Sequence, residues 1–268
     1  MRIGIDARFY GTGNKGLGKY TQKLIENLEE IYLQIENKKN GHNNDQFFIF
    51  LRKDNFNEYH PKSKNFKKVL ADYKWYSFSE QIKMPQLLNK YKLDLVHFPH
   101  FNVPFFYRKK FIVTIHDLIL LHFPTIRGTT LNPILYWLKF LAYKIIINRA
   151  IKKSNKIITV SNFTKDDILA NYLISSKKII VTYEACDDDN SYSQKSVSEI
   201  DKYGIIKPYL LYVGNAYPHK NLERMAEAWQ IFNTKQAKHL HLVLVGRKDY
   251  FYNQLQKTVK EKKIKNII

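Results

Sequence analysis

The stretch RIGIDARFYGTGNKGLGKYT, residues 2–21, decides the fold, because it joins a strand pattern to a helix pattern through a glycine-rich loop. Residues 2–6 form the short apolar run that is typical of a buried strand. After the glycines, apolar side chains recur at the spacing of a helix that begins near Lys19, at Tyr20, Leu24, Leu28, Ile31 and Ile35. A strand, a loop and a helix in this order predict the first half of a parallel α/β unit.

The same alternation continues along the chain. Further short runs rich in β-branched and aromatic residues are predicted to be strands, at residues 47–51, 66–70, 94–98, 111–116, 156–160, 178–183, 209–214 and 241–246. Helical patterns lie between several of them. Strands that alternate with helices predict a parallel sheet covered by helices on both faces, so the expected fold class is α/β.

A polar, turn-rich segment, DDDNSYSQKSVSEIDKYG, interrupts this pattern from Asp187. The expected organisation is a first Rossmann-like domain over residues 1–187, a linker over residues 188–207 and the start of a second domain over residues 208–268. That second stretch of about 60 residues is too short for a complete doubly wound unit, and it stops where another strand is expected to begin. The sequence is therefore expected to be a fragment, or a natural truncation, of a longer protein.

The glycine loop fits two phosphate-binding motifs incompletely. Residues 11–16, GTGNKG, have the spacing of a dinucleotide fingerprint, but the first glycine does not follow the strand directly and no acidic residue ends a strand about 20 positions on. Residues 13–20, GNKGLGKY, resemble a P-loop that lacks its Ser or Thr. A third interpretation is that Gly16 and Gly18 let an anion approach the N–H groups at a helix start, and a plain surface turn stays open as an alternative.

The formal charge is +20, from 44 Lys and Arg against 24 Asp and Glu. Such a charge favours a polyanionic neighbour, meaning nucleic acid, a membrane surface or a phosphate-bearing substrate, although heavy use of Lys and Asn could also produce it. The positive charge is spread along the chain without a helix-turn-helix, RNP or zinc pattern, so nucleic-acid binding is the weaker alternative and no nucleic-acid partner is expected. The single cysteine, Cys186, excludes an intramolecular disulfide framework.

The most apolar long stretch is LNPILYWLKFLAYKIIINRA, which begins at Leu131. Lys139 and Lys144 interrupt it, whereas a helix that spans a bilayer needs about 20 nearly uncharged residues. A packed helix is therefore expected here, and a helix that rests on a membrane surface is the alternative.

Taken in order, several segments resemble one family: IGIDARFYG and GLGKYT, then DLVHFPHF, TIHDL, IITVSNFTKDDI, YLLYVGNAYPHKNLERM and LVLVG. Together they resemble the retaining glycosyltransferases of family 4, and most of all the mannosyltransferase-like members that act on bacterial surface polysaccharides. The resemblance covers essentially the whole chain, and the order of the segments carries it rather than any one motif. It implies the GT-B fold, in which an acceptor domain and a nucleotide-sugar donor domain face each other.

The resemblance assigns roles to residues of the first domain. Gly16 and Gly18 match the glycine loop that approaches the donor diphosphate. His116 matches the catalytic histidine near the donor sugar. Asp117 follows it, and either orients His116 or caps a turn.

In the second domain, Lys220 matches the basic residue that neutralises the leaving diphosphate and is also counted as catalytic. Asn215 stands where family members often have Arg, so it is assigned to donor binding as a neutral hydrogen-bonding group; Arg224 and Arg247 are alternative sources of the missing charge. The family's acidic Glu-x7-Glu segment would lie beyond Ile268, so this chain alone is expected to be inactive.

The implied reaction is transfer of a hexose, with retention, from a nucleotide-sugar such as GDP-mannose or a UDP-sugar to a glycan or a lipid-diphosphate-sugar acceptor. No metal and no further cofactor are expected. The expected location is cytoplasmic and peripheral at the inner face of the plasma membrane, where Lys109–Lys110 and Lys152–Lys153 are candidate contacts with anionic lipid. An inactive fragment that binds an acceptor or a partner is the main alternative function.

Overall fold

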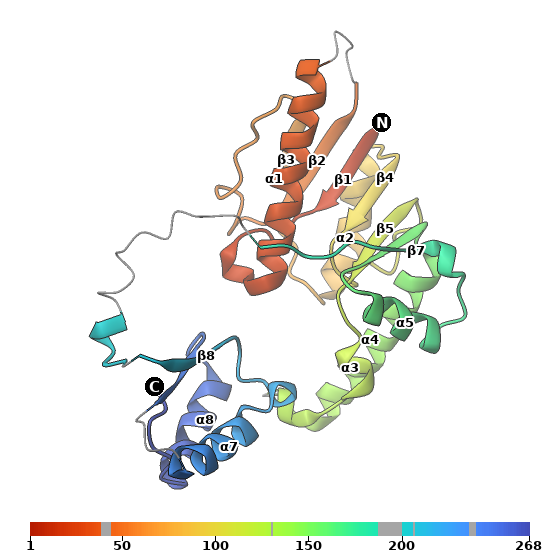
Figure 1. Ribbon diagram of the computed structural model, residues 1–268. Helices are drawn as coiled ribbons and strands as arrows, with labels where there is room; N and C mark the ends of the chain where they lie inside the picture. Colours follow the sequence, from red (N-terminus) through yellow and green to blue (C-terminus); the bar gives the residue numbers. More distant parts are fainter. Residues whose placement is uncertain (39–43, 130, 187–199, 206, 236–239) are drawn as a thin grey trace. The chain divides into compact units, whose positions relative to one another are not determined.

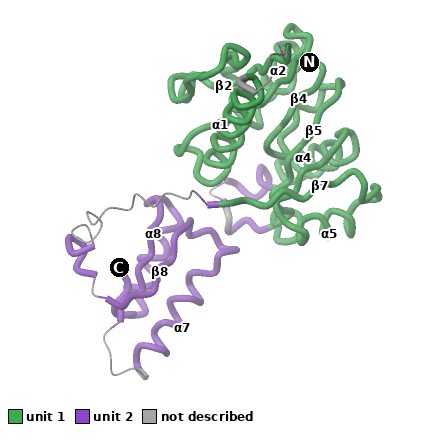
Figure 2. The backbone as a smooth tube through the Cα atoms, turned by 45° about the horizontal axis from the view of Figure 1, so that its top comes forward, with its two compact units in different colours: residues 1–124, 137–185 green, residues 125–136, 186–268 purple. Residues whose placement is uncertain are grey.

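The computed structural model describes residues 1–38, 44–129, 131–186, 200–205, 207–235 and 240–268. It divides into two compact units, one formed by residues 1–124 and 137–185 and the other by residues 125–136 and 186–268 (Figure 2). Most of the predicted linker, from residue 188 to residue 199, lies outside the described residues.

The first unit is built on one parallel sheet in the order β3-β2-β1-β4-β5-β6-β7 (Figure 1). Every neighbouring pair of strands is parallel, as the alternating sequence pattern predicted. The strands are β1 (Arg2–Asp6), β2 (Gln46–Leu51), β3 (Phe66–Leu70), β4 (Leu95–Phe98), β5 (Phe111–Ile115), β6 (Lys156–Thr159) and β7 (Ile179–Val181). The strand β1 pairs with β2 on one side and with β4 on the other, so the order of the strands reverses its direction at β1. In open α/β sheets, ligands bind at the carboxyl ends of the strands beside such a switch point.

Helices cover both faces of this sheet, because the side chains of a strand alternate between its faces. In β2, Phe47 and Ile49 pack with Ile25 of α1 (Lys15–Lys38), whereas Phe48 and Phe50 join the opposite core. That second core also holds residues of α2 (Phe78–Lys90), α4 (Pro133–Lys153) and α5 (Asn162–Asn171). A short helix, α3 (Ile119–His122), follows β5.

Two predicted boundaries differ from the structure. The helix after the glycine loop begins at Lys15 rather than near Lys19, preceded by a 3-10 helix at Thr12–Asn14. The run at 178–183 forms a strand only at Ile179–Val181, after a 3-10 turn at Ser176–Lys178. The apolar stretch from Leu131 forms the helix α4, which packs one face into the core of the first unit. Among the described residues, no helix is long and apolar enough to cross a membrane.

The second unit contains a parallel pair of strands, β8 (Tyr209–Val213) and β9 (His241–Val245). The helices α7 (Leu222–Lys235) and α8 (Tyr250–Glu261) contribute Trp229 and Leu255 to its small cores. Beyond α8 the chain returns to β9, where Ile267 forms a parallel bridge with Leu242. The strand expected to begin in the last residues is thus confirmed at the level of this bridge.

Candidate active site

Three histidines gather where β4 and β5 end in the first unit. His97 lies within β4, His100 follows that strand, and His116 directly follows β5. His97 is buried, and its Nε2 lies 2.9 Å from the hydroxyl of Thr114, which itself lies 3.2 Å from the hydroxyl of Tyr20. Burial, and then the neighbouring His116, lower the pKa of His97 to about 4 and that of His100 to about 3, so both rings are neutral at pH 7.

His116 is held on several sides but keeps one-fifth of its side chain exposed. Its Nε2 lies 3.0 Å from the carbonyl oxygen of Pro99. A carbonyl only accepts, so Nε2 carries the proton and donates it. The Nδ1 atom lies 3.5 Å from a carboxylate oxygen of Glu184, and the ring of Tyr20 meets the imidazole edge-on at 4.7 Å. The hydroxyl of Thr164 also donates to the backbone carbonyl of His116, at 2.9 Å.

This arrangement joins two sequence-predicted features. Tyr20 belongs to the first turns of α1, just after the glycine loop, so the loop and His116 lie at the same edge of the sheet. Sequence reasoning did not assign Tyr20 or Glu184 to the site. Glu184 had a detectable signal, because it follows a predicted strand and the carboxyl ends of parallel strands share one edge.

Asp117 is exposed, and its Oδ1 accepts a hydrogen bond of 3.0 Å from the backbone N–H of Ile119. This contact is the turn-capping alternative of the sequence analysis. The carboxylate recorded beside the His116 ring is that of Glu184.

The two glycines assigned to the diphosphate differ in their surroundings. A Cβ on Gly18 would lie 2.0 Å from the carbonyl oxygen of Gly11, so this position admits no side chain without a backbone shift. A Cβ on Gly16 would meet nothing within 4 Å. Both residues lie in the first turn of α1, whose N–H groups have no partners within the helix. The loop thus offers backbone N–H donors at the carboxyl end of β1. Close packing against the Gly11 carbonyl is already sufficient to explain why residue 18 is a glycine.

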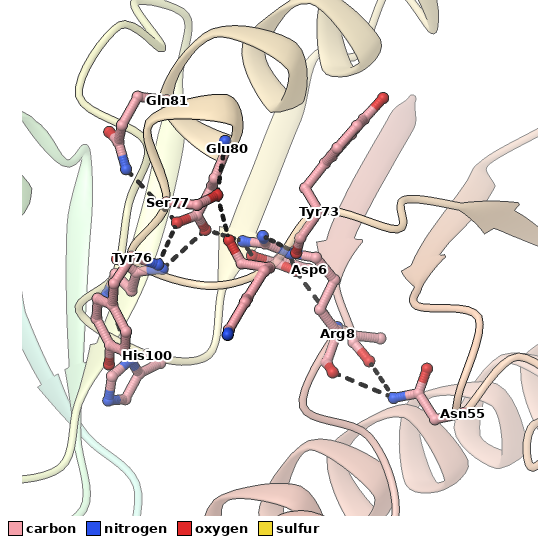
Figure 3. A network of polar contacts seen from close by, with 12 residues as sticks. Asp6, Arg8, Asn55, Tyr73, Tyr76, Ser77, Glu80, Gln81 and His100 are labelled. Atoms are coloured by element: carbon pink, nitrogen blue, oxygen red, sulfur yellow. Dashed lines mark hydrogen bonds and ion pairs between the residues drawn. The ribbon is translucent and has the colours of Figure 1, made fainter.

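A buried ionic cluster lies beside this loop (Figure 3). The fully buried guanidinium of Arg8 contacts the carboxylate of Asp6 at 2.7 Å and that of Glu80 at 2.6 Å. Glu80 also accepts from the backbone N–H of Tyr76 and from the side chain of Asn102, each at 2.8 Å. Burial opposes the charge of Arg8, but the two carboxylates outweigh it and raise the pKa of Arg8. Burial raises the pKa of Glu80, and Arg8 offsets part of that rise.

This cluster fixes the segment that connects β1 to α1. Asn55 adds three contacts from its side-chain amide, to the carbonyl oxygens of Ala7, Arg8 and Tyr10 at 3.0–3.3 Å (Figure 3). This cluster was not predicted from the sequence. Its available signals were a charged residue at the end of a buried strand, a second one two positions later, and the capping box SFSE at residues 77–80, where Ser77 accepts from the N–H of Glu80.

The second unit carries the other predicted residues. Asn215 follows β8, and its Oδ1 accepts from the N–H of Tyr217 at 3.4 Å. Lys220 is exposed at the end of a 3-10 helix, Pro218–Lys220, just before α7. The same unit contains a pocket of about 420 Å³ lined by Ile126, Arg127, Thr129, Ala216, Tyr217, Pro218, Asn221, Leu222, Glu223, Tyr250, Phe251, Gln254, Leu255 and Thr258.

The predicted residues therefore fall into two groups. His116, Asp117 and the glycine loop belong to the first unit, and Asn215 and Lys220 belong to the second. Among the described residues, no group of three His, Cys, Asp or Glu side chains could hold a metal ion.

Known proteins resemble the chain at the level of sequence. A family model described as Glycosyltransferase Family 4 matches residues 42–190. The O-antigen chain mannosyltransferase RfbU of Salmonella typhimurium is 24% identical over 186 residues, which are 69% of this chain and 46% of that protein. The O-antigen chain mannosyltransferase B of Escherichia coli is 24% identical over 260 residues, which are 86% of this chain and 60% of that protein. This chain thus covers less than two thirds of either relative.

Solved structures resemble it in fold. Sucrose-phosphate synthase from Thermosynechococcus elongatus has a TM-score of 0.63 at 13% identity, over 100% of this chain and 69% of that one. Anabaena HepE in complex with UDP and glucose has a TM-score of 0.56 at 14% identity, over 99% of this chain and 67% of that one. These similarities and the parallel sheet confirm the predicted α/β fold of GT-B type. Because the family model covers more than half of the residues, the chain belongs to glycosyltransferase family 4.

Proposed function

We propose that the protein carrying this chain transfers a hexose, with mannose as the first candidate, from a nucleotide-sugar to a glycan or a lipid-diphosphate-sugar acceptor during bacterial polysaccharide or cell-envelope synthesis. The two O-antigen mannosyltransferase relatives support the sugar and the pathway class. HepE, whose structure contains UDP and glucose, supports a nucleotide-sugar donor such as GDP-mannose or a UDP-sugar. The proposed setting is the cytoplasm, peripheral to the inner face of the plasma membrane.

The placement of His116 is the observation that carries this proposal. The ring sits at the carboxyl edge of the sheet, oriented by the Pro99 carbonyl at Nε2 and partly exposed beside Glu184. Ligands of open parallel sheets bind at this edge. A fixed and partly exposed imidazole there is suited to contact the hydroxyl groups of a sugar close to the reacting carbon.

The proposed transfer retains the configuration of the sugar. The bond from the anomeric carbon to the diphosphate oxygen breaks, and its electron pair leaves with the diphosphate. The acceptor oxygen bonds to the same carbon from the same face, and its proton passes to the departing phosphate. The proposed transfer needs neither a metal ion nor a further cofactor to account for its bonds, electrons and proton.

In this scheme the chain stabilises the charge that develops on the leaving group. Lys220 brings a positive charge to the departing diphosphate, where such charges lower the barrier most. Asn215 donates a hydrogen bond from its amide. In the first unit, the N–H groups around Gly16 and Gly18 at the start of α1 are proposed contacts for the donor diphosphate.

A second candidate function is acceptor binding without transfer. The observation that favours it is that the His116 environment is assembled entirely within the first unit. An acceptor could therefore bind this unit whether or not a donor site is complete.

The test is a transfer assay that also determines the linkage. The purified protein that carries this chain is incubated with radiolabelled GDP-mannose or UDP-glucose and membranes from an O-antigen-producing bacterium, and the labelled product is digested with an α- and a β-specific glycosidase. Both donors carry an α-linked sugar, so retention predicts an α-linked product. A β-linked product would contradict retention. Label incorporated from neither donor, together with sedimentation of the acceptor lipid with the protein, would establish the second candidate instead.

A further inference from the structure

The helix α4 is apolar on two opposite faces. One face packs into the core of the first unit through Tyr143, Ile147 and Ala150. From Trp137 onward the other face exposes large apolar side chains, with exposed fractions of 50% for Trp137, 60% for Leu138, 56% for Leu141 and 48% for Ile145. A helix that is apolar all round is normally covered on every side. The outer face of α4 therefore has the composition of a contact surface.

The spacing of the exposed residues makes them one continuous stripe. Leu138, Leu141 and Ile145 are separated by three and four positions, so they lie one above another on the helix. At 100° per residue this stripe points away from the buried residues Tyr143 and Ile147. Monomeric soluble proteins rarely expose contiguous apolar patches of this kind unless the patch has a binding role.

The charges on the helix are all positive. Its sequence, PILYWLKFLAYKIIINRAIKK, contains no Asp or Glu, and its cationic residues are Lys139, Lys144, Arg149, Lys152 and Lys153. The guanidinium of Arg149 lies 5.0 Å from the ring centre of Phe105, and both Phe105 and the next residue, Phe106, are exposed. Exposed, basic Arg108, Lys109 and Lys110 follow after the buried Tyr107. Through Arg149, the helix that carries the apolar stripe thus meets an exposed aromatic pair with basic residues nearby.

We propose that this surface, formed by Trp137, Leu138, Leu141 and Ile145 of α4 with Phe105 and Phe106, rests on an anionic lipid bilayer. Apolar and aromatic side chains enter the boundary between headgroups and acyl chains, and flanking lysines meet the lipid phosphates. The combination of a Leu, Ile and Trp stripe with purely basic flanks distinguishes a lipid surface from nucleic acid, which offers no place for aliphatic side chains. The proposal rests on the proposed function for its setting, since a lipid-linked acceptor would lie in the same membrane.

The test is vesicle flotation with the complete chain and no sugar donor, so its outcome is independent of transfer activity. Vesicles of phosphatidylcholine are compared with vesicles of phosphatidylcholine and phosphatidylglycerol. The wild-type chain is expected to float with the anionic vesicles, to bind neutral ones less, and to lose binding as salt screens the charges.

The variant Leu141→Glu places a carboxylate in the stripe, and Leu173→Glu, at a fully exposed leucine outside it, makes the same chemical change. We expect Leu141→Glu to lower the bound fraction about tenfold, because a buried apolar side chain is lost and a charge must be desolvated, while Leu173→Glu has a small effect. Circular dichroism confirms that both variants fold. Equal losses in the two variants, or a wild-type chain that does not float, would overturn the proposal. So would a wild-type dimer that Leu141→Glu dissociates, because a second copy would then cover the stripe.

Discussion

Replacing the buried His97 by glutamine should remove a defined part of the acid sensitivity of the first unit. The ring of His97 is 5% exposed, and its Nε2 lies 2.9 Å from the Thr114 hydroxyl. The amide of Gln can reach the same hydroxyl without titrating. The variant His97→Gln therefore keeps the contact and removes the ionisable group.

The size of the effect follows from the pKa. Burial lowers the pKa of His97 from 6.5 to about 4, so between these values the unfolded chain binds a proton that the folded chain does not. Stability must then fall as the pH falls through 6.5 toward 4. With about 1.4 kcal/mol for each pH unit, lowering the pH from 7 to 5 should cost about 2 kcal/mol of unfolding free energy through His97.

The measurement is urea unfolding of the wild type and of His97→Gln at both pH values, followed by circular dichroism. Because other groups titrate in both proteins, the informative quantity is the difference between the two pH-dependent losses. The variant should lose about 2 kcal/mol less than the wild type between pH 7 and 5. Equal losses would show that His97 titrates normally, and would refute a neutral buried ring at this edge of the sheet.

Three further substitutions test the loop beside the site. Arg8→Met leaves the carboxylates of Asp6 and Glu80 buried without their cation, and should destabilise the chain by about 3–5 kcal/mol in urea unfolding at pH 7; a change under about 1 kcal/mol would contradict the buried pairing. Gly18→Ala forces a methyl group against the Gly11 carbonyl and should cost about 1–3 kcal/mol, whereas Gly16→Ala, which meets nothing, should not lower the melting temperature. Equal melting temperatures for the two alanine variants would contradict the close packing at Gly18.

Local pattern was sufficient for much of the fold. The strands β1, β2, β4 and β5 of the first unit follow from short apolar runs, since burial on both faces demands β-branched and aromatic residues at nearly every position. Ser161 stands directly before a helical pattern, which is the place of an N-cap, and its side chain accepts from the N–H of Thr164. The start of α1 was harder, because a 3-10 turn and glycines at its beginning carry no hydrophobic period.

The site required contacts that are distant in sequence. Glu184 reaches His116 across 68 positions (184 − 116), and Glu80 reaches Arg8 across 72 (80 − 8). No spacing rule of a helix or a strand encodes such pairs; the order of the strands in the sheet creates them. His116 itself was predicted from its motif and its position at a strand end. Its contacts with Pro99 and Glu184 became visible only in the structure.

Transfer of labelled hexose by His116→Ala, measured beside His122→Ala, tests the central claim most directly. His122 is also a histidine near a carboxylate, at 2.7 Å from Asp167, but it is more exposed and lies outside the proposed centre. We expect His116→Ala to lower kcat by about a hundredfold or more without changing the fold, and His122→Ala to retain activity. Lys220→Ala should lose transfer, because the lysine charge that stabilises the leaving diphosphate is removed. Full transfer by His116→Ala would contradict the assignment of the reaction centre to the carboxyl edge of β5.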